Sequence, residues 1–402
     1  MIRFNSNHRL FTILAFMLIG IMQFFISPVL VSANNISTVT IKLGDSFFVI
    51  AISKVIHVPG DYSSINLAIQ AVEDEGTILV DDGTYNEDLW IMGEDTKTYT
   101  IISKNGPGKT IINGSGANSV VTFSDKSQST LEGFTIQNGK NTYGGGILCG
   151  TSSKPKIIKC NIYNNQAVTG GGGIHIPDYS SPYIENCNII GNSANGSITE
   201  SYGGGIQMSL LAKPTIINSV FKNNISTHIA GAIAIAEAQP KIINCAFINN
   251  SARNFAGAIA INYAEPQIIN CTFRDNHTTS EESRGGAISS NYNLPGTMVV
   301  NSIFWNNSEL NGLNDLRVQF NVIFEGVSNS LFQDGAYKPG GPYPGINNIV
   351  GDPLFLPDSD YLISGTSPAI DKGDPSVAPL IDIQNQSRPQ RTGIDIGVDE
   401  VP

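Results

Sequence analysis

Charged residues are scarce in this sequence, and positive charge is the scarcer kind. Lysine and arginine number 23 among 402 residues, against 34 aspartates and glutamates, which gives a formal net charge of −11. A chain with this balance lacks the basic stripe that nucleic-acid binding requires. The balance is compatible with calcium or with a neutral glycan as ligand.

Motifs of established chemistry are also missing. The sequence has no serine–histidine–aspartate constellation, no metal-ligand spacing and no phosphate-binding loop. Of its five cysteines, Cys160, Cys187, Cys245 and Cys271 share one position of an internal repeat with two serines, which predicts small buried core residues. Side chains stacked in parallel suit a disulfide poorly, so we expect free thiols, with Cys149 on another strand.

A repeat of about 26 to 32 residues fills the middle of the chain. Its copies begin at Pro155, Pro182, Pro214, Pro240 and Pro266, and a degraded copy covers residues 297–307. Apolar residues in each copy alternate with variable ones, which is the period of a β-strand. The pattern predicts an all-β parallel solenoid of about nine or ten coils, with three parallel sheets around one core.

Several positions of the repeat form columns that should stack from coil to coil. One aliphatic column consists of Ile157, Ile184, Ile216, Ile242, Ile268 and Val299. A second apolar column consists of Ile162, Ile189, Phe221, Phe247, Phe273 and Phe304. A third follows the glycines and consists of Ile147, Ile174, Ile206, Ile233, Ile259 and Ile288. We expect Phe247 and Phe273 to stack inside the solenoid.

Asparagine and glycine mark the corners. One asparagine column consists of Asn165, Asn192, Asn224, Asn250, Asn276 and Asn307, and another of Asn186, Asn218, Asn244, Asn270 and Asn301. Asparagine tolerates the left-handed conformation of tight corners and forms amide ladders between stacked coils. The glycines that begin at Gly144, Gly171, Gly203 and Gly285 predict a corner with positive φ. Between the asparagines and the glycines the repeat varies in length, so we expect loops to project there.

These elements carry a family resemblance. The paired GG[AG]I and FxxN elements resemble those of right-handed parallel β-helix proteins of the pectate-lyase-like superfamily, and the resemblance implies a right-handed coil. Residues 83–87, Gly-Thr-Tyr-Asn-Glu, resemble the opening of pectin methylesterases and of many surface β-helix proteins, but the later esterase active-site motifs are absent. The last ninety residues, with Gly351-Asp-Pro-Leu-Phe and a final Asp395-Ile-Gly-Val-Asp-Glu400, resemble the choice-of-anchor Q domain. That resemblance implies a surface protein.

The chain divides into four predicted parts. Residues 1–33 form an export signal, with Arg3 before an apolar run from Leu10 to Ile26 and a small-residue cleavage site at Val31–Ala33; a retained membrane anchor is the alternative. Residues 34–142 form the N-terminal cap and first coils, including a short helix capped by Ser63 or Ser64. Residues 143–310 are the repeated coils, and residues 311–402 are the C-terminal coils and the choice-of-anchor Q-like region. We expect a secreted or cell-surface monomer without a membrane span after signal cleavage.

Candidate binding residues follow the inward-pointing isoleucines. The residue after each isoleucine should point outward, and that line is small and neutral. Slightly further on come acids and aromatics, which are Asp178, Tyr179, Glu237, Tyr263, Glu265 and Tyr292. Aromatic faces and carboxylates are groups that bind sugar rings and hydroxyls. The alternative is that these are ordinary exposed turn residues.

Calcium is the one cofactor that the sequence leaves open. Asp371, Asp374 and Asp395 are weak candidates for calcium ligands in the C-terminal region. The competing interpretation places these carboxylates in Asx turns and near Arg388. We otherwise expect no cofactor.

Three functions remain open. The leading hypothesis is an exported or surface β-helix that binds a polysaccharide or cell-surface glycan, or mediates adhesion, without catalysis. The second is a polysaccharide lyase or glycoside hydrolase, whose catalytic residues the sequence does not identify. The third is a purely structural envelope component.

Overall fold

The computed structural model describes residues 38–43, 46–51, 55–93, 97–281, 284–293, 296–310, 312–313, 316–318, 327–333 and 346–402. The predicted export signal, residues 1–33, lies outside them. The chain forms two compact units, Met1–Lys54 and Val55–Pro402. In the first unit β1 (Thr38–Leu43) pairs antiparallel with β2 (Ser46–Ala51). No described helix combines the length and hydropathy needed to cross a membrane.

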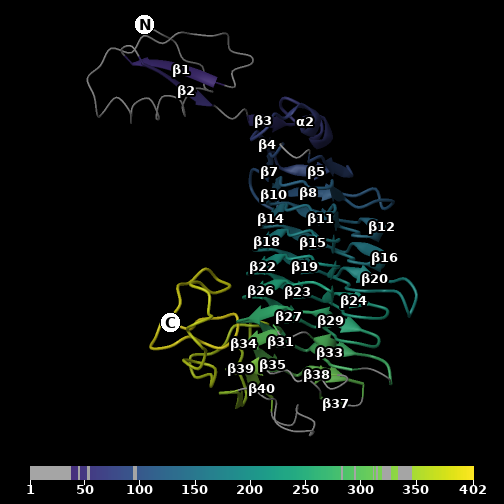
Figure 1. The fold of residues 1–402 in the computed structure, drawn as a ribbon, viewed down its shortest axis with the longest axis vertical. Helices are drawn as coiled ribbons and strands as arrows, with labels where there is room; N and C mark the ends of the chain where they lie inside the picture. The colour runs from purple at the N-terminus through teal and green to yellow at the C-terminus, as the bar shows by residue number, and fades with distance from the viewer. Residues whose placement is uncertain are drawn as a thin grey trace. The chain divides into compact units, whose positions relative to one another are not determined.

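The second unit is a parallel β-solenoid of about nine turns, as predicted (Figure 1). Three long sheets, which we name B, C and D, run along it, with a shorter sheet E. Sheet B contains β3 (Val55–Val58), β4 (Thr77–Val80), β7 (Thr100–Ser103), β10 (Thr130–Glu132), β14 (Lys156–Ile158), β18 (Tyr183–Glu185), β22 (Thr215–Ile217), β26 (Lys241–Ile243), β30 (Gln267–Ile269), β34 (Met298–Val300) and β39 (Val327–Ser328).

Sheets C and D complete the wall around the core. Sheet C contains β5 (Gly83–Tyr85), β8 (Thr110–Asn113), β11 (Thr135–Gln137), β15 (Asn161–Tyr163), β19 (Asn188–Ile190), β23 (Val220–Lys222), β27 (Ala246–Ile248), β31 (Thr272–Arg274), β35 (Ile303–Trp305), β40 (Leu331–Phe332) and β41 (Ile349–Val350). Sheet D contains β6 (Leu89–Ile91), β9 (Val121–Phe123), β13 (Ile147–Leu148), β17 (Ile174–Ile176), β21 (Ile206–Met208), β25 (Ile233–Ala236), β29 (Ile259–Ala264), β33 (Ile288–Asn293) and β38 (Leu316–Val318).

The core is built from the predicted columns. Ile216, Ile242 and Ile268 pair in register and are fully buried. The phenylalanines stack as expected: the ring centroids of Phe247 and Phe273 lie 4.8 Å apart with nearly parallel planes. Each coil therefore buries side chains that its neighbours would otherwise leave exposed.

The corners confirm most of the turn predictions. The asparagine column that includes Asn250 is a buried amide ladder, in which each Nδ2 donates to the Oδ1 of the next coil at 2.9–3.1 Å. The second column, which includes Asn244, adopts φ between 50° and 53°. Gly144, Gly171 and Gly203 have φ between 62° and 64°, so the glycine corner is left-handed too.

One stretch differs from the expected projecting loops. The residues just after the asparagine ladder pair across coils and form sheet E. Its strands are β12 (Lys140–Tyr143), β16 (Gln166–Gly170), β20 (Ser193–Ala194), β24 (Ile225–Ser226), β28 (Ser251–Ala252), β32 (His277–Thr278), β36 (Ser308–Glu309) and β37 (Gly312–Leu313). The ladder places the asparagine at the same position in every coil. The backbone that follows it therefore lies at strand spacing from the same repeat position of the next coil and pairs with it. The largest length variation lies beyond sheet E, before the glycines, and the corner between sheets D and B varies by one or two residues.

The N-terminal end of the solenoid is closed by α2 (Ile65–Ala71). Ser64 is its N-cap and accepts a hydrogen bond from the backbone N–H of Leu67 at 3.2 Å. The Glu87 carboxylate accepts the N–H groups of Ile65 and Asn66, which explains the glutamate of the Gly-Thr-Tyr-Asn-Glu motif. Ile65, Ala68 and Ile69 are buried, so the helix covers the core as predicted.

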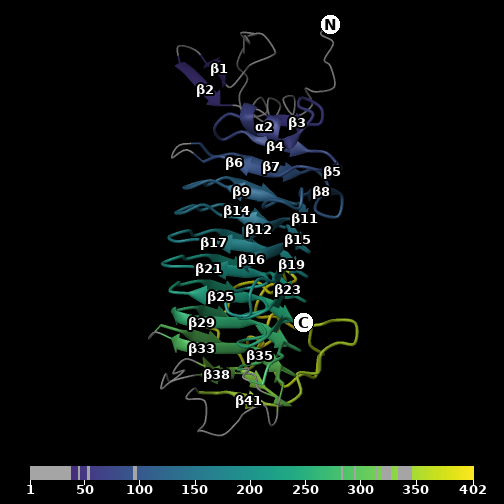
Figure 2. The same cartoon turned by 90° about the vertical axis from the view of Figure 1, so that its right-hand side faces the viewer.

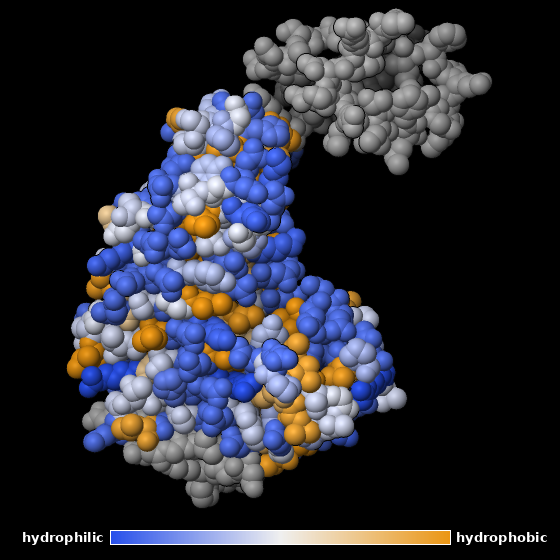
Figure 3. Space-filling view, turned by 180° about the vertical axis from the view of Figure 1, so that it is seen from behind, coloured by the Kyte–Doolittle hydropathy of each residue, from blue (hydrophilic) through white to orange (hydrophobic). Residues whose placement is uncertain are grey.

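The C-terminal segment, residues 351–402, follows β41 and folds back along the outer side of the last coils (Figures 1 and 2). Ile363, Ala369 and Ile396 pack with Ile303 of β35. Hydrogen bonds attach it to the left-handed asparagines: Asn244 Nδ2 donates to the Ile381 carbonyl, Asn270 Nδ2 to the carbonyls of residues 395 and 397, and Asn301 Nδ2 to that of residue 374. Seen from behind, the surface of this unit is largely hydrophilic, with apolar residues in small patches (Figure 3).

All five cysteines are free and buried, in agreement with the repeat pattern. Cys187 and Cys271 donate from Sγ to backbone carbonyls within the core. Burial raises the pKa of the Cys160 thiol to about 11 and that of Cys149 to about 12. Thiolates, the reactive form, are therefore disfavoured at neutral pH.

Candidate functional site

The outer face of sheet D is only partly open. Its outward residues are Trp90, Thr122, Leu148, His175, Gln207, Ala234, Ala260 and Ser289, in register from β6 to β33. Ala234, Ala260 and Ser289 point away from the core, as predicted, yet no more than 9% of each residue is exposed. The predicted line of small residues is therefore a packed surface, not a groove.

A second layer covers these small residues. Single parallel bridges run from Gly170 through Tyr202, Ile229 and Phe255 to Arg284, beside sheet D. Tyr202 and Ile229 pack on a cluster of Ala230, Ala234, Ala256 and Ala260. The cover is interrupted at Gly170, which has no side chain to extend over the sheet. Tyr143 occupies the preceding position of the same column, and a hollow lies beside it over the first four strands of sheet D.

The hollow over these strands, which we name the sheet-D hollow, measures about 590 Å³. Trp90, Asp125, Asn141, Tyr143 and His175 contribute to its lining. Trp90 is 58% exposed and Tyr143 is 39% exposed, although both belong to strands. Two large aromatic side chains thus face solvent in the same concavity.

His175 lies deepest among these residues, with 8% of its surface exposed. Its ring centroid lies 4.8 Å from that of Tyr143. Desolvation lowers the pKa of His175 to about 4, and the neighbouring Gln207 side chain opposes this shift only in part. A side chain at Gly170 would collide with Gln207, because a Cβ there would lie 2.3 Å from Gln207 Oε1. Gly170 therefore makes room for the neutral histidine and its neighbour.

Another hollow, of about 440 Å³, lies at the corner between sheets D and B; we name it the corner hollow. Leu211, Glu237, Tyr263 and Glu265 line it. Leu211, Glu237 and Tyr263 occupy equivalent positions in successive coils, with φ of 58°, 53° and 50°. Gln239 Nε2 donates to Glu265 Oε2 at 2.9 Å, which orients that carboxylate.

The structure gathers three of the six predicted binding residues. Glu237, Tyr263 and Glu265 share the corner hollow. Tyr179 occupies the same left-handed corner, one coil before Leu211, and is 52% exposed; Asp178 precedes it and is half-buried. Tyr292 lies in β33 with its backbone opposite Asn262, and its side chain is outside the described part of the chain.

Trp90, Asp125 and Tyr143 are site residues that the repeat pattern missed. Trp90 and Asp125 belong to early coils whose sequence departs from the repeat, so extrapolating a column did not reach them. Tyr143 directly precedes Gly144, within the stretch expected to form loops. Trp90 itself was a signal for this site. The sequence has only two tryptophans, and a tryptophan at an outward position of a strand is unusual.

The predicted calcium candidates are occupied by other contacts. Asp371 Oδ1 accepts from the Gly393 N–H, Asp374 Oδ1 from Ser376, and Asp395 from the N–H groups of Asp371 and Val401. No group of three or more metal-ligating side chains occurs among the described residues. These contacts support the alternative interpretation, in which the carboxylates form Asx turns or lie near Arg388.

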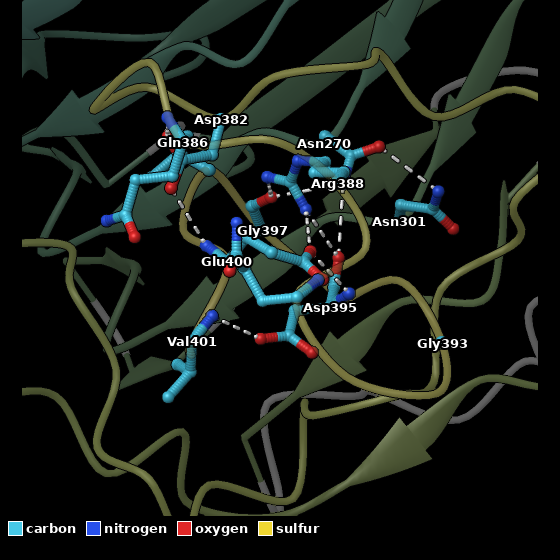
Figure 4. A network of polar contacts seen from close by, with 12 residues as sticks. Asn270, Asn301, Asp382, Gln386, Arg388, Gly393, Asp395, Gly397, Glu400 and Val401 are labelled. Carbon is cyan, nitrogen blue, oxygen red and sulfur yellow. Dashed lines mark hydrogen bonds and ion pairs between the residues drawn. The ribbon is translucent and has the colours of Figure 1, made fainter.

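Arg388 is the centre of a buried network (Figure 4). Its Nη1 forms an ion pair with Glu400 Oε2 at 2.8 Å, and its Nη2 donates to the carbonyl of residue 397. Desolvation lowers the pKa of Arg388 and raises those of Asp395, Asp399 and Glu400, with Asp399 reaching about 6. The network holds the C-terminal segment together and offers no open site.

The two hollows share one electrostatic feature. Neither is lined by a lysine or an arginine among the residues that the structure describes, while Asp125, Glu237 and Glu265 bring negative charge. A lyase mechanism that removes a proton with a lysine or arginine base has no such group in either hollow. The lining is equipped to stack on rings and to accept hydrogen bonds from hydroxyl groups.

A family model agrees with the fold. Residues 95–251 match the model of the "Right handed beta helix region" family, which supports the predicted handedness. A pectate lyase matches with a TM-score of 0.44 and 11% identity over 87% of this chain and 97% of its own. The deglycosylated pectin methylesterase of Aspergillus niger matches with a TM-score of 0.32 and 15% identity over 64% and 85%.

A further structural match is a mannuronic-acid-specific lyase from human gut microbiota, with a TM-score of 0.31 and 10% identity over 74% of this chain and 83% of its own. No curated protein sequence matches the chain. The likeness to these solved structures concerns the fold alone.

Proposed function

We propose that this protein is secreted or displayed at the cell surface, where it binds a polysaccharide or cell-surface glycan without cleaving it. The observation that carries the proposal is a row of equivalent left-handed corners, which holds Tyr179, Leu211, Glu237 and Tyr263. We name it the corner row. The predicted export signal and the resemblance of the C-terminal region to choice-of-anchor Q domains support the location.

The geometry of the corner row suits a repetitive polymer. Equivalent corners are separated by about 4.8 Å per coil. Tyr179 and Tyr263 are about half exposed, at 52% and 47%, with Glu237 between them in the row. A sugar unit can stack on a tyrosine ring while its hydroxyls donate to a carboxylate. Weak contacts of this kind add along a chain that engages several of them at once.

Binding without cleavage is favoured by the exposure of Glu237. Glycoside hydrolysis uses two carboxyl groups on either side of the bond, and Glu237 and Glu265 do share the corner hollow. Glu237 is, however, exposed to solvent, whereas a general acid works from a pocket that excludes water. This pair of glutamates is the specific observation that keeps hydrolysis as the second candidate function.

The experiment is a glycan array combined with product analysis. We expect the wild type to bind a glycan and release neither reducing ends nor unsaturated products, with or without calcium. Tyr263→Ala should weaken binding about tenfold, equivalent to about 1.4 kcal/mol. Ile225→Ala is the matched control, because Ile225 is 52% exposed on sheet E, away from the corner row.

The outcomes separate the three functions. If no glycan binds, the structural role is favoured and the proposal is wrong. If Tyr263→Ala binds as tightly as the wild type, the corner row is not the site. If products accumulate and Glu237→Gln abolishes them, the protein is an enzyme: a hydrolase if the products are saturated, and a lyase if they are unsaturated.

A further inference from the structure

We propose that the sheet-D hollow is a second binding site, separate from the corner row, and that it takes an uncharged sugar unit. Its floor is formed by the outward residues Thr122, Leu148 and His175 of adjacent strands. Trp90 and Tyr143 rise beside this floor. The inference stands on these residues and does not depend on binding at the corner row.

The aromatic side chains provide the first argument. Trp90 occupies an outward position of sheet D and keeps 58% of its surface in solvent. Further along the same column the equivalent positions are alanine and serine under a packed cover. Tyr143 is oriented by its contact with His175, at a centroid distance of 4.8 Å. Two aromatic faces in one concavity match the apolar face of a pyranose ring.

The buried polar group beneath provides the second argument. His175 is more than nine-tenths buried, and its Nδ1 has no hydrogen-bond partner among the described residues. Gln207, the next residue of the column, does not line the hollow, so His175 is the buried polar side chain that the hollow reaches. Buried polar atoms are normally paired, so an unpaired imidazole nitrogen in the lining supports a ligand contact there. A sugar hydroxyl both donates and accepts, and it therefore satisfies a neutral imidazole in either tautomer.

The charge of the lining selects among sugars. The described lining contains Asp125 and no lysine or arginine. Asp125 Oδ1 accepts from the Thr151 N–H at 2.8 Å, which fixes the carboxylate at the rim. A uronate would meet this carboxylate without a cation to balance it, in a protein whose net charge is −11. An uncharged hexose or pentose unit meets no such repulsion.

Tryptophan fluorescence gives a direct test, because the chain has only two tryptophans. Trp305 packs against the C-terminal cluster, far along the solenoid from β6, so Trp305→Phe leaves Trp90 as the single reporter. Neutral oligosaccharides of glucose, mannose, xylose and galactose are titrated in turn, and oligogalacturonate of equal length is the charged comparison. We expect at least one neutral series to shift the Trp90 emission, and oligogalacturonate to leave it unchanged.

Two variants locate the site. In the otherwise wild-type protein, Trp90→Ala should weaken calorimetric binding of the active neutral oligosaccharide at least tenfold; because Trp90 is exposed, the variant is expected to fold. Tyr263→Ala, introduced into the Trp305→Phe background, should leave the Trp90 signal intact, since it belongs to the corner row. This control separates the present proposal from the preceding one.

Two results would overturn the inference. The first is an emission shift with oligogalacturonate equal to or larger than that with every neutral sugar. The second is an unchanged Trp90 emission with all saccharides, even where the glycan array detects binding through the corner row.

Discussion

Asn250 offers the sharpest test of what holds the coils in register. The side chain is fully buried in the amide ladder. Its Nδ2 donates to the Phe221 carbonyl and to Asn276 Oδ1, both at 2.9 Å. Its Oδ1 accepts from the N–H and the Nδ2 of Asn224 at 3.0 and 2.9 Å. One amide group therefore connects three consecutive coils.

The magnitude for Asn250→Ala follows from those contacts. The Asn224 N–H loses its acceptor in the core, and leaving a buried donor unsatisfied costs about 1–3 kcal/mol. Asn276 Oδ1 and Asn224 Nδ2 keep other partners, so their loss is smaller. The removed amide also leaves a small cavity. We expect the free energy of unfolding to fall by about 2–4 kcal/mol.

The neighbouring Asn249 is the matched control. Asn249 is exposed, has φ of 50°, and donates from its side chain only along the surface, to Asn223. Asn249→Gly removes an asparagine from the same corner while easing the left-handed conformation, so stability should change by less than about 0.5 kcal/mol. Equilibrium urea unfolding, followed by circular dichroism, compares the two. If Asn250→Ala costs no more than Asn249→Gly, the ladder is not what fixes the register.

Two further predictions concern the core and the C-terminal segment. Phe247→Ala should destabilise the protein by about 3–5 kcal/mol, because the ring is fully buried between stacked neighbours; a change under about 1 kcal/mol in urea unfolding would contradict the stacking argument. Acidification from pH 7 to about 5 should stabilise the C-terminal segment. Burial raises the pKa of Asp395, Asp399 and Glu400. The folded state therefore binds protons more tightly than the unfolded state, and protonation favours folding. This contribution is complete near pH 4 and is lost as pH rises through about 6, the pKa of Asp399. Trp305 packs against the segment, so its fluorescence in urea at the two pH values measures the effect, and earlier unfolding at pH 5 would refute it.

The solenoid was predictable because its core repeats. Strand periodicity and a fixed position for Ile242 or Phe247 in every copy determine which face is buried, and the structure confirms both. Sheet E was not predictable in the same way. Its strands have only one inward column, of small residues such as Ala194, Ser226 and Ala252, and the outward column mixes serine with Ile225. Two residues, the length of most of these strands, are too few to show the alternation that marks a strand in the sequence.

The candidate sites were predictable only where they repeat. Glu237 and Tyr263 were found because they occupy one repeat position, and the structure places them in one hollow. Trp90 lies in an early coil outside the repeat, and Tyr143, although it matches Tyr202 in the repeat, borders a hollow where Gly170 occupies the same position in the next coil. A gap in a layer leaves no periodic signal in the sequence.

The attachment of the C-terminal segment changes how the solenoid can come apart. In a stack of coils each unit contacts only its neighbours, so opening can begin at any exposed end and spread one coil at a time. The side chains of Asn244, Asn270 and Asn301 belong to successive coils, yet all three hold the same returning segment. Releasing any one of these coils strains the attachment of the others. The C-terminal half should therefore open as a single cooperative block, while the coils upstream of the segment retain the stepwise behaviour of a simple stack.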